Sequence, residues 1–568
     1  MRILFFSPYS AIWLAAMPES LIARELNNAG HEIHVMRCDT TLRSYCPSMT
    51  AHGLDFDSSE KWKSNICTSC MNARDVMDNQ FNLSHSVFQD YVTDSDLKEI
   101  DQIIESVNHE NWEQFSINGI EVGKYATYEV FLNHKISNKS EIELIFDEYL
   151  NNLKQCAIAN LAISRLLTTH AVDRIVVYNS LYSLNRTVVK TGESFGVEWR
   201  TIHGGRNIAD MHQTISINRS DSSDFLIAKS DFWRVHKSAT LSKEKINYVG
   251  EHISYQLSAK SAFTYSSKKK NIKPEELRKK LNIEARKDVI LCTLASEDER
   301  FSADIIGVLD FKMSEGTSIF RSNIEWLKFL VDFVELNNQF HLIIRVHPRM
   351  LPNKREGKTS AAINHLEEFF TQIPSSVTVN RPSDGISIYD LAKIVDVVVN
   401  ATSTVGLELL SFGIPVVNHC PEILFSYPAE FNYIGTTHQE YGDAIKRAAN
   451  DGRSISNSIN AFRYRSFLFK QYSISLHDGV PKRTSLSAIR IVTWLTLRKN
   501  CVFLVGLLSA LQRNELRRVP GKLNESPKLV HAVEQSSFDA EYFDGGLGLS
   551  EDEEKNLIEQ TLRKLQVW

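Results

Sequence analysis

Two short polar segments of the chain carry side chains suited to binding a phosphate group. They are Arg345-Val-His-Pro-Arg349 and Asn400-Ala-Thr-Ser-Thr404, and each directly follows an apolar run. Imidazole and guanidinium groups make charge-assisted hydrogen bonds to phosphate oxygens. Hydroxyls at positions 402–404 can cap a helix, whose first N–H groups attract anions. The candidate phosphate-binding residues are therefore Arg345, His347, Pro348, Thr402, Ser403 and Thr404.

Two more residues are expected at the same place. Glu408 lies in the helix predicted after Thr404, and its carboxylate can accept two hydroxyl hydrogen bonds at once. Ser296 follows the apolar run Asp288–Leu294 and could hydrogen-bond a phosphate. Either polar segment alone is equally compatible with a plain helix cap and an ordinary loop histidine. The two segments together, in this order, favour a ligand site.

A histidine followed by two glycines, at positions 203–205, comes after the strand predicted at Glu198–Ile202. Glycine lets a ligand approach the backbone closely, and imidazole can take a proton near neutral pH. His203 is therefore the candidate general base, with Asp210 and Glu19 as alternatives. Two other roles remain open for His203, which are binding of the acceptor or a phosphate and an ordinary place in a loop.

Half of the eight cysteines lie within one short segment, at positions 38, 46, 67 and 70. The last two form a C-x-x-C pair, which can hold one metal ion through two thiolates. Cys38 and Cys46 could complete a four-thiolate structural zinc site without an open position for chemistry, although their spacing is not that of a standard zinc knuckle. The alternative is four unpaired thiols. The candidate ligands are Cys38, Cys46, Cys67 and Cys70.

These side chains must be positioned by alternating strands and helices. Short apolar runs typical of strands buried on both faces occur at Arg2–Phe6, Arg174–Tyr178, His341–Val346 and Val395–Val399. A helix is predicted from Pro18 to Gly30 and a long amphipathic one over Ile142–Leu167. Because parallel strands end at one edge of a sheet, the polar segments should meet there. The sequence thus predicts an α/β fold.

The His347-Pro348 pair after one strand, with Ser403-Thr404 at the start of a later helix, resembles the sugar-nucleotide-binding half of GT-B glycosyltransferases. More narrowly, it is similar to the capsule polysaccharide biosynthesis group, which includes Kdo transferases and sialyltransferases. The resemblance implies that these residues hold the donor's phosphate and nucleoside, and that Glu408 contacts the ribose. It also implies two Rossmann-like domains that face a cleft.

The expected division has four parts. Residues 1–257 form an acceptor domain with a cysteine-rich segment at 38–70, a helical insertion at about 75–141, and last strands at Phe225–Ala228 and Ile246–Val249. The lysine-rich residues 258–287 form a linker. Residues 288–455 form the nucleotide-sugar-binding domain. Residues 456–568 form a helical extension that packs across the cleft or lies on a membrane surface.

Composition narrows the class of protein. The chain has 568 residues, 43% of them hydrophobic and 23% charged, which is ordinary for a globular protein. A net charge of -5 gives no reason to expect nucleic acid as a partner. The start of the chain, at 1–8, suits a first strand better than a signal peptide. We expect a cytoplasmic protein with at most peripheral membrane contact.

The expected function is transfer of a sugar from a CMP- or UDP-linked donor to a cell-surface or capsular glycan, free or lipid-linked. Since no D-x-D motif is evident, the chemistry needs no metal cofactor in this interpretation, and structural zinc is the one metal expected. Alternatives on the same fold are a sugar-nucleotide epimerase and a glycerophosphate-type transferase. A different class is a non-catalytic partner of another glycan-assembly enzyme, with the pocket kept as a relic.

Overall fold

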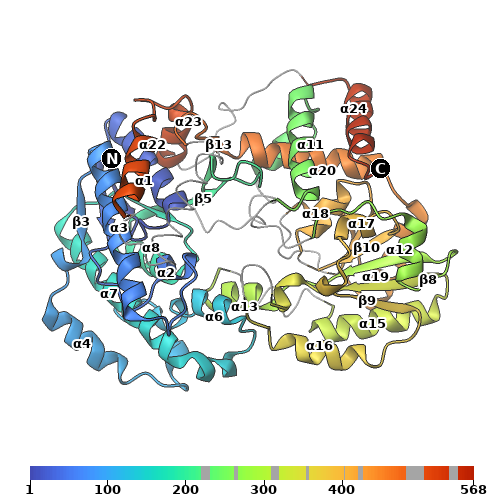
Figure 1. The fold of residues 1–568 in the computed structure, drawn as a ribbon, viewed down its shortest axis with the longest axis horizontal. Coiled ribbons are helices and arrows are strands. Elements are labelled where there is room, and N and C mark those ends of the chain that lie inside the picture. Colours follow the sequence, from blue (N-terminus) through green and yellow to red (C-terminus); the bar gives the residue numbers. More distant parts are fainter. Residues whose placement is uncertain are drawn as a thin grey trace.

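The computed structural model describes residues 1–218, 231–260, 267–308, 319–352, 357–401, 403–419, 427–480, 505–535 and 548–568. The strand expected at Phe225–Ala228 lies outside these residues, as does Thr402. The described chain forms two α/β units, each built on its own sheet, that lie side by side in Figure 1. The prediction of two Rossmann-like units in a GT-B-like arrangement is confirmed.

The first unit is built on a seven-stranded sheet with the order β13-β6-β5-β4-β1-β2-β3. Its strands are β1 (Arg2–Phe6), β2 (Glu32–Arg37), β3 (His85–Val87), β4 (Arg174–Tyr178), β5 (Glu198–Gly204), β6 (Thr214–Asn218) and β13 (Ile474–Ser475). The pairs among β1 to β5 are parallel, whereas β6 runs antiparallel to both β5 and β13. The last strand, β13, comes from a distant part of the chain.

The second unit is built on a six-stranded sheet with the order β12-β11-β10-β7-β8-β9, in which every pair is parallel. Its strands are β7 (Asp288–Thr293), β8 (Phe340–Arg345), β9 (Val377–Asn380), β10 (Val397–Asn400), β11 (Val416–Asn418) and β12 (Tyr433–Ile434). Strands β8 and β10 are buried along their whole length, as expected for strands covered by helices on both faces.

Helices cover both sheets. They are α1 (Trp13–Asn28), α2 (Pro47–Ala51), α3 (Glu60–Phe81), α4 (Asp94–Ile104), α5 (Val122–Tyr125), α6 (Tyr128–His134), α7 (Phe146–Thr169), α8 (Ser183–Ser194), α10 (Asp231–His236), α11 (Lys243–Leu257), α12 (Pro274–Lys280), α13 (Glu297–Ile305), α15 (Asn323–Leu336), α16 (Ala362–Phe370), α17 (Ile388–Leu391), α18 (Val405–Leu410), α19 (His438–Asp451), α20 (Ile455–Ser466), α22 (Val505–Leu516), α23 (Ser526–Glu534) and α24 (Glu551–Lys564). A π-helical turn, η7 (Phe467–Gln471), continues α20.

Two helices pack in the core of one unit although the strand that precedes each of them in the sequence belongs to the other unit. Ile246 and Ile253 of α11 are buried in one core with Val289 of β7, so the strand predicted at Ile246–Val249 is wrong. Conversely, Ile305 of α13 is buried in the core of the first unit, together with Phe131 of α6. Figure 1 shows α6 and α13 side by side where the two units meet. The two units are therefore interlocked.

The C-terminal part of the chain divides between both units (Figure 1). Helices α22 and α23 pack on α3 and α1 of the first unit, and α24 packs on α11 and α20. Leu508 and Leu529 are buried in the first unit's core, which agrees with packing across the molecule for the described residues of this extension. Among the helices that the structure describes, none combines the length and apolar character needed to cross a membrane.

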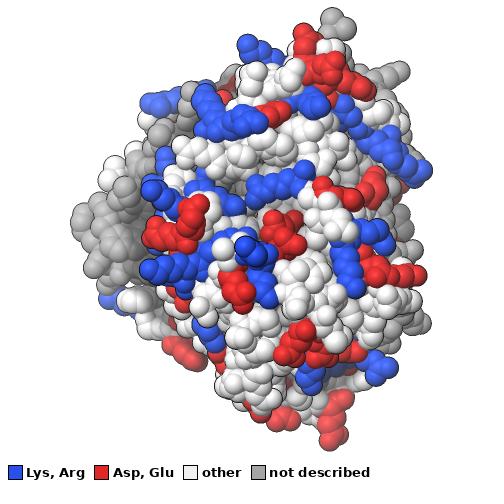
Figure 2. Space-filling view, turned by 90° about the vertical axis from the view of Figure 1, so that its right-hand side faces the viewer, with Lys and Arg blue, Asp and Glu red and all other residues white. Residues whose placement is uncertain are grey.

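Figure 2 shows the outer face of the second unit. On this face the side chains of Lys and Arg are interspersed with those of Asp and Glu. Arg381 and Glu367, also in the second unit, form an ion pair whose charged atoms lie 2.5 Å apart. A mixed surface of this kind creates only a weak long-range field, because neighbouring charges of opposite sign cancel at a distance.

Candidate functional site

A cavity of about 250 Å³ opens between the two units, at the carboxyl edge of the second sheet. This edge is where ligands bind in open parallel sheets. The cavity is lined by Arg206, Ile208, His252, Gln256, Thr293, Leu294, Arg345, His347, Pro348, Ile388, Tyr389, Ser403, Thr404, Val405, Leu407, Glu408, Arg465, Leu468 and Phe469. The structure thus brings together both polar segments singled out in the sequence.

His347 lies just beyond the end of β8 and is kept neutral by its surroundings. Burial, together with the charges of Arg349 and Arg345, lowers the pKa of His347 to about 4. Its Nδ1 accepts a hydrogen bond of 3.3 Å from the backbone N–H of Arg349. The proton of the neutral ring is therefore on Nε2, which can donate to an oxygen of a ligand.

Two buried guanidinium groups face the same cavity. Arg345 ends β8, donates to the carbonyl of Ile386 at 2.8 Å, and has a pKa lowered by burial to about 10. Arg465 of α20 is 3% exposed and donates to Ser411 Oγ at 3.0 Å. Burial lowers the pKa of Arg465, and the nearby charge of Glu408 raises it. Both groups stay charged at neutral pH, so the cavity favours an anion.

Glu408 supplies the cavity with a carboxylate. Tyr389 Oη donates to Glu408 Oε2 at 2.9 Å. Burial raises the pKa of Glu408, whereas Arg465 and Tyr389 lower it. This arrangement leaves further lone pairs of the carboxylate to accept hydroxyl groups of a ligand.

The segment before α18 brings the hydroxyl groups of Ser403 and Thr404 to the cavity. Thr404 is the N-cap residue of α18 but makes no side-chain cap bond, while Ser403 Oγ accepts from the N–H of Val405 at 3.4 Å. A Cβ atom at Gly406 would lie 2.1 Å from Tyr427 Oη, so only glycine fits there. Gly413 follows the end of α18 and has a φ of +79°, in the left-handed region that favours glycine.

Ser296 does not line the cavity, and its phosphate contact stays a prediction. Its hydroxyl donates to Asp298, and the residue is 6% exposed as the N-cap of α13. Asp298 in turn accepts from Arg349 Nε at 2.9 Å. The acidic residue after β7 is therefore neutralised by an arginine from the loop after β8, which the sequence could not indicate.

His203 and Asp210 lie outside the cavity lining. His203 is the penultimate residue of β5 and not in the loop after it; its ring stacks on Tyr178 with centroids 6.4 Å apart. Asp210 accepts from Tyr248 and lies 3.3 Å from His477 Nε2. Arg206, from the same segment, reaches the cavity instead. The role of His203 as a base stays a prediction.

Glu19 lies in the second turn of α1, because this helix begins at Trp13 and not at Pro18 as predicted. It is 5% exposed and accepts from Ser7 Oγ at 2.6 Å. Burial raises its pKa from 4.5 to about 7, although Ser7 and Arg37 oppose the shift. A carboxyl group with this pKa can exchange a proton near neutral pH.

The raised pKa of Glu19 predicts a pH-dependent effect of Glu19→Gln. Between about pH 4.5 and 7 the folded chain keeps a proton on Glu19 that the unfolded chain loses, so stability falls as pH rises. The glutamine variant lacks this loss and should gain up to about 3 kcal/mol relative to wild type between pH 5 and 8. Urea unfolding at both pH values measures the gain. Equal differences at the two pH values would contradict it.

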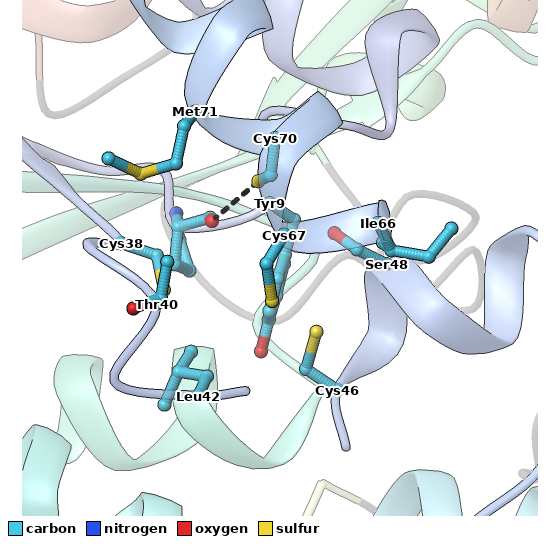
Figure 3. Close-up of a pocket in the computed structure, with 11 residues that line it drawn as sticks. Tyr9, Cys38, Thr40, Leu42, Cys46, Ser48, Ile66, Cys67, Cys70 and Met71 are labelled. Atoms are coloured by element: carbon cyan, nitrogen blue, oxygen red, sulfur yellow. Dashed lines mark hydrogen bonds between the residues drawn. The ribbon is translucent and has the colours of Figure 1, made fainter. Parts of the chain in front are cut away.

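The four cysteines of the N-terminal segment line a separate small cavity with Tyr9 (Figure 3). None of them forms a disulfide, and burial raises the pKa of all four thiols, to about 12 for Cys46 and about 11 for Cys67. As the side chains stand, the described ranges contain no group of three or more His, Cys, Asp or Glu placed to hold a metal ion. The zinc site stays a prediction.

Some lining residues were missed in the sequence. Arg465 and Phe469 come from the aromatic and basic stretch 462–470. Its composition is visible in the sequence, but nothing in the sequence shows that it packs at the cavity. His252 of α11 is buried, with Nδ1 2.9 Å from Asn207 Oδ1 and its ring 4.5 Å from that of Phe469. His252 was not predicted as a lining residue, because a strand was predicted at Ile246–Val249 where the structure has α11.

No family model and no curated protein matches the chain. Solved structures that match the chain include the β-Kdo 2,4-transferase KpsC of Thermosulfurimonas dismutans, at 13% identity over 51% of this chain and 87% of that one, with a TM-score of 0.27. Another is a UDP-GlcNAc 2-epimerase from Neisseria meningitidis bound to UDP-GlcNAc, at 10% identity over 82% and 99%, with a TM-score of 0.23. A third is spinosyn rhamnosyltransferase SpnG, at 11% identity over 83% and 97%, with a TM-score of 0.24. Because these identities and TM-scores are low, the fold assignment depends on the two sheets seen in this chain and not on the matches.

Proposed function

We propose that the protein is a glycosyltransferase that moves a sugar from a nucleotide-linked donor to a glycan or lipid-linked glycan acceptor. The observation that carries this proposal is the cavity at the carboxyl edge of the second sheet, which Arg345, Arg465 and His347 line together with one carboxylate, Glu408. An anionic ligand that also carries hydroxyl groups would give hydrogen-bond partners to all four side chains. A nucleotide has both, in its phosphate and its ribose.

The leaving phosphate would bind between the guanidinium groups and the Nε2–H of His347. These donors are preorganised by bonds to the protein, so they stabilise the charge that develops when the sugar–phosphate bond breaks. Ser403 and Thr404 line the same cavity and offer further hydroxyl donors. Glu408 would accept the ribose hydroxyls, as the resemblance to GT-B transferases implies.

The acceptor would approach from the first unit, across the cleft. Arg206 and Ile208 follow β5 and bring this unit into the cavity wall. His203 remains the proposed base that removes the acceptor's hydroxyl proton, with Glu19 and Asp210 as alternatives. A cell-surface or capsular glycan as acceptor, a CMP- or UDP-linked donor and a cytoplasmic site of action, with at most peripheral membrane contact, complete the proposal.

Ligand-dependent thermal stability tests this function. We expect one of CMP, CDP, UDP or GDP, or a sugar conjugate of it, to raise the melting temperature of the full chain, because a ligand that binds only the folded state stabilises it. His347→Ala should lose most of this shift. His341→Ala is the matched control, since His341 is buried in β8 and bonds Thr378 Oγ1 at 2.9 Å, away from the cavity lining.

The outcomes separate the candidate functions. A shift for one nucleotide that vanishes in His347→Ala supports the donor site and leads to a search for glycan products with that donor. Conversion of a sugar nucleotide without an acceptor indicates an epimerase. A stable protein that responds to none of the ligands contradicts the donor site and favours a non-catalytic partner.

A further inference from the structure

Four thiols that are separated in the sequence converge at one place in the first unit. Cys38 follows β2 directly, Cys46 is the N-cap residue of α2, and Cys67 and Cys70 lie one turn apart in α3. All four line a cavity of about 20 Å³ (Figure 3). The fold therefore brings the four cysteines to one cavity, although their spacing in the sequence is not that of a standard zinc site.

The surroundings of this cavity are largely apolar, with Leu42, Ile66 and Met71 among its lining residues. The hydroxyl oxygen of Tyr9 is buried and has no hydrogen-bond partner within the described part of the chain. Figure 3 shows the Tyr9 hydroxyl and the sulfurs of Cys46 and Cys67 pointing toward the same space. A buried polar atom without a partner is unusual in a folded protein and suggests that a further group belongs in such a place.

We propose that Cys38, Cys46, Cys67 and Cys70 bind one Zn²⁺ ion as a structural four-thiolate site. Zinc prefers a tetrahedron of sulfur ligands at about 2.3 Å, and a C-x-x-C pair supplies two of them from neighbouring positions. The sulfurs must turn toward a common centre, because they do not stand in ligand geometry now. Rotation about χ1 is the movement open to each sulfur, because it is the one torsion of a cysteine side chain that moves the sulfur.

Binding converts four thiols and Zn²⁺ into a tetrathiolate complex of charge −2 and releases four protons to solvent. Nothing is oxidised or reduced. Arg74 lies beside the site, with Nη1 3.5 Å from the carbonyl oxygen of Cys38, and its guanidinium is also paired with Asp75 Oδ1 at 2.7 Å. Four protein ligands leave no open coordination position, so the ion would have no part in sugar transfer.

The position of the site indicates what the ion would stabilise. Cys70 Sγ accepts from the N–H of Ala11 at 3.4 Å and donates to the carbonyl of Pro8 at 3.7 Å. Pro8 and Ala11 belong to the loop after β1, at the carboxyl edge of the first sheet. The ion would therefore join this loop to β2, α2 and α3.

Metal content of the full chain, purified without chelators from zinc-supplemented medium, tests the proposal. We expect about one zinc per chain, and less than about a tenth of that in Cys67→Ser/Cys70→Ser. Cys156→Ala should keep its zinc, because Cys156 is buried in α7 outside the cluster. Cobalt titrated into the zinc-stripped wild type should give the charge-transfer absorption of tetrahedral thiolate ligands.

Two results would overturn the proposal. One is wild-type protein that holds less than about a tenth of a zinc per chain and shows no thiolate-to-cobalt band on titration. The other is a disulfide among the four cysteines, found by mass spectrometry after alkylation without reduction. Both are measured on wild type, so they stand even if the double variant does not fold. Neither depends on the nucleotide site, which is tested separately by the melting temperatures.

Discussion

Replacing Arg349 by methionine is expected to lower the free energy of unfolding by about 3–5 kcal/mol, the usual cost of removing one partner of a buried ion pair. Arg349 is 4% exposed and Asp298 is 1% exposed, and Arg349 Nη2 lies 2.8 Å from Asp298 Oδ2. Without the guanidinium, Asp298 keeps a buried charge with no arginine beside it. Arg349 Nη2 also donates to the carbonyl of Leu132 in α6 at 2.9 Å, which joins the two units. Urea unfolding measures the loss.

Arg381→Met is the matched control for this prediction. Arg381 pairs with Glu367 at 2.5 Å, but the two side chains are 34% and 42% exposed, so solvent screens the pair. We expect a loss of at most about 1 kcal/mol. A second variant, Arg349→Met/Asp298→Asn, should recover part of the stability because it removes the buried charge. Equal losses for Arg349→Met and Arg381→Met would show that burial of the pair does not matter.

Replacing Arg465 by methionine should weaken binding of the nucleotide that stabilises wild type by roughly 30- to 1,000-fold, equivalent to about 2–4 kcal/mol. The side chain faces the cavity from α20 and brings a buried positive charge to it. Its loss removes a proposed donor to the ligand phosphate and leaves Glu408, which accepts from Tyr389 Oη, without the nearby positive charge of Arg465. Isothermal titration with the nucleotide measures the change in Kd.

A double variant separates binding from folding. Glu408→Gln removes the carboxylate charge that Arg465 offsets, so Arg465→Met/Glu408→Gln should recover stability lost by Arg465→Met. It should not recover affinity, because both proposed ligand contacts are absent. Wild-type affinity in the double variant would mean that Arg465 acts on the fold alone and that the phosphate lies elsewhere.

The central strands of both sheets were predictable because they are short apolar runs buried on both faces. The predicted strands Arg2–Phe6 and Arg174–Tyr178 coincide with β1 and β4. Short edge strands such as β3 and β12 have too few residues to form a recognisable pattern. The helix α11 was mistaken for a strand because Ile246 and Val249 were considered alone. With Ile253 and Leu257 they follow helical spacing, and all four are buried.

The candidate site was predictable only where its residues lie in strand-to-helix connections of one sheet. His347 follows β8, and Ser403 and Glu408 follow β10. These two parallel strands flank β7 and end at the same edge of the sheet, so local sequence order indicates that the residues meet. Arg465 and His252 reach the same cavity through packing of helices far along the chain, which leaves no local pattern. Ser296 lies outside the cavity lining, where its hydroxyl donates to Asp298, and Asp298 is itself held by a residue from another loop.

Because of the interlocked helices, we expect the two sheets to unfold as a single cooperative unit. Phe131 of α6 stacks on Phe301 of α13 with ring centroids 5.8 Å apart, and Arg186 Nη2 donates to the carbonyl of Ile306 at 3.1 Å. A chain cut before α13 would expose the apolar groove that Ile305 and Ile306 fill in the first unit. Severing the molecule at its apparent boundary would thus yield aggregation-prone halves, while calorimetry of the intact protein should record one transition in place of two.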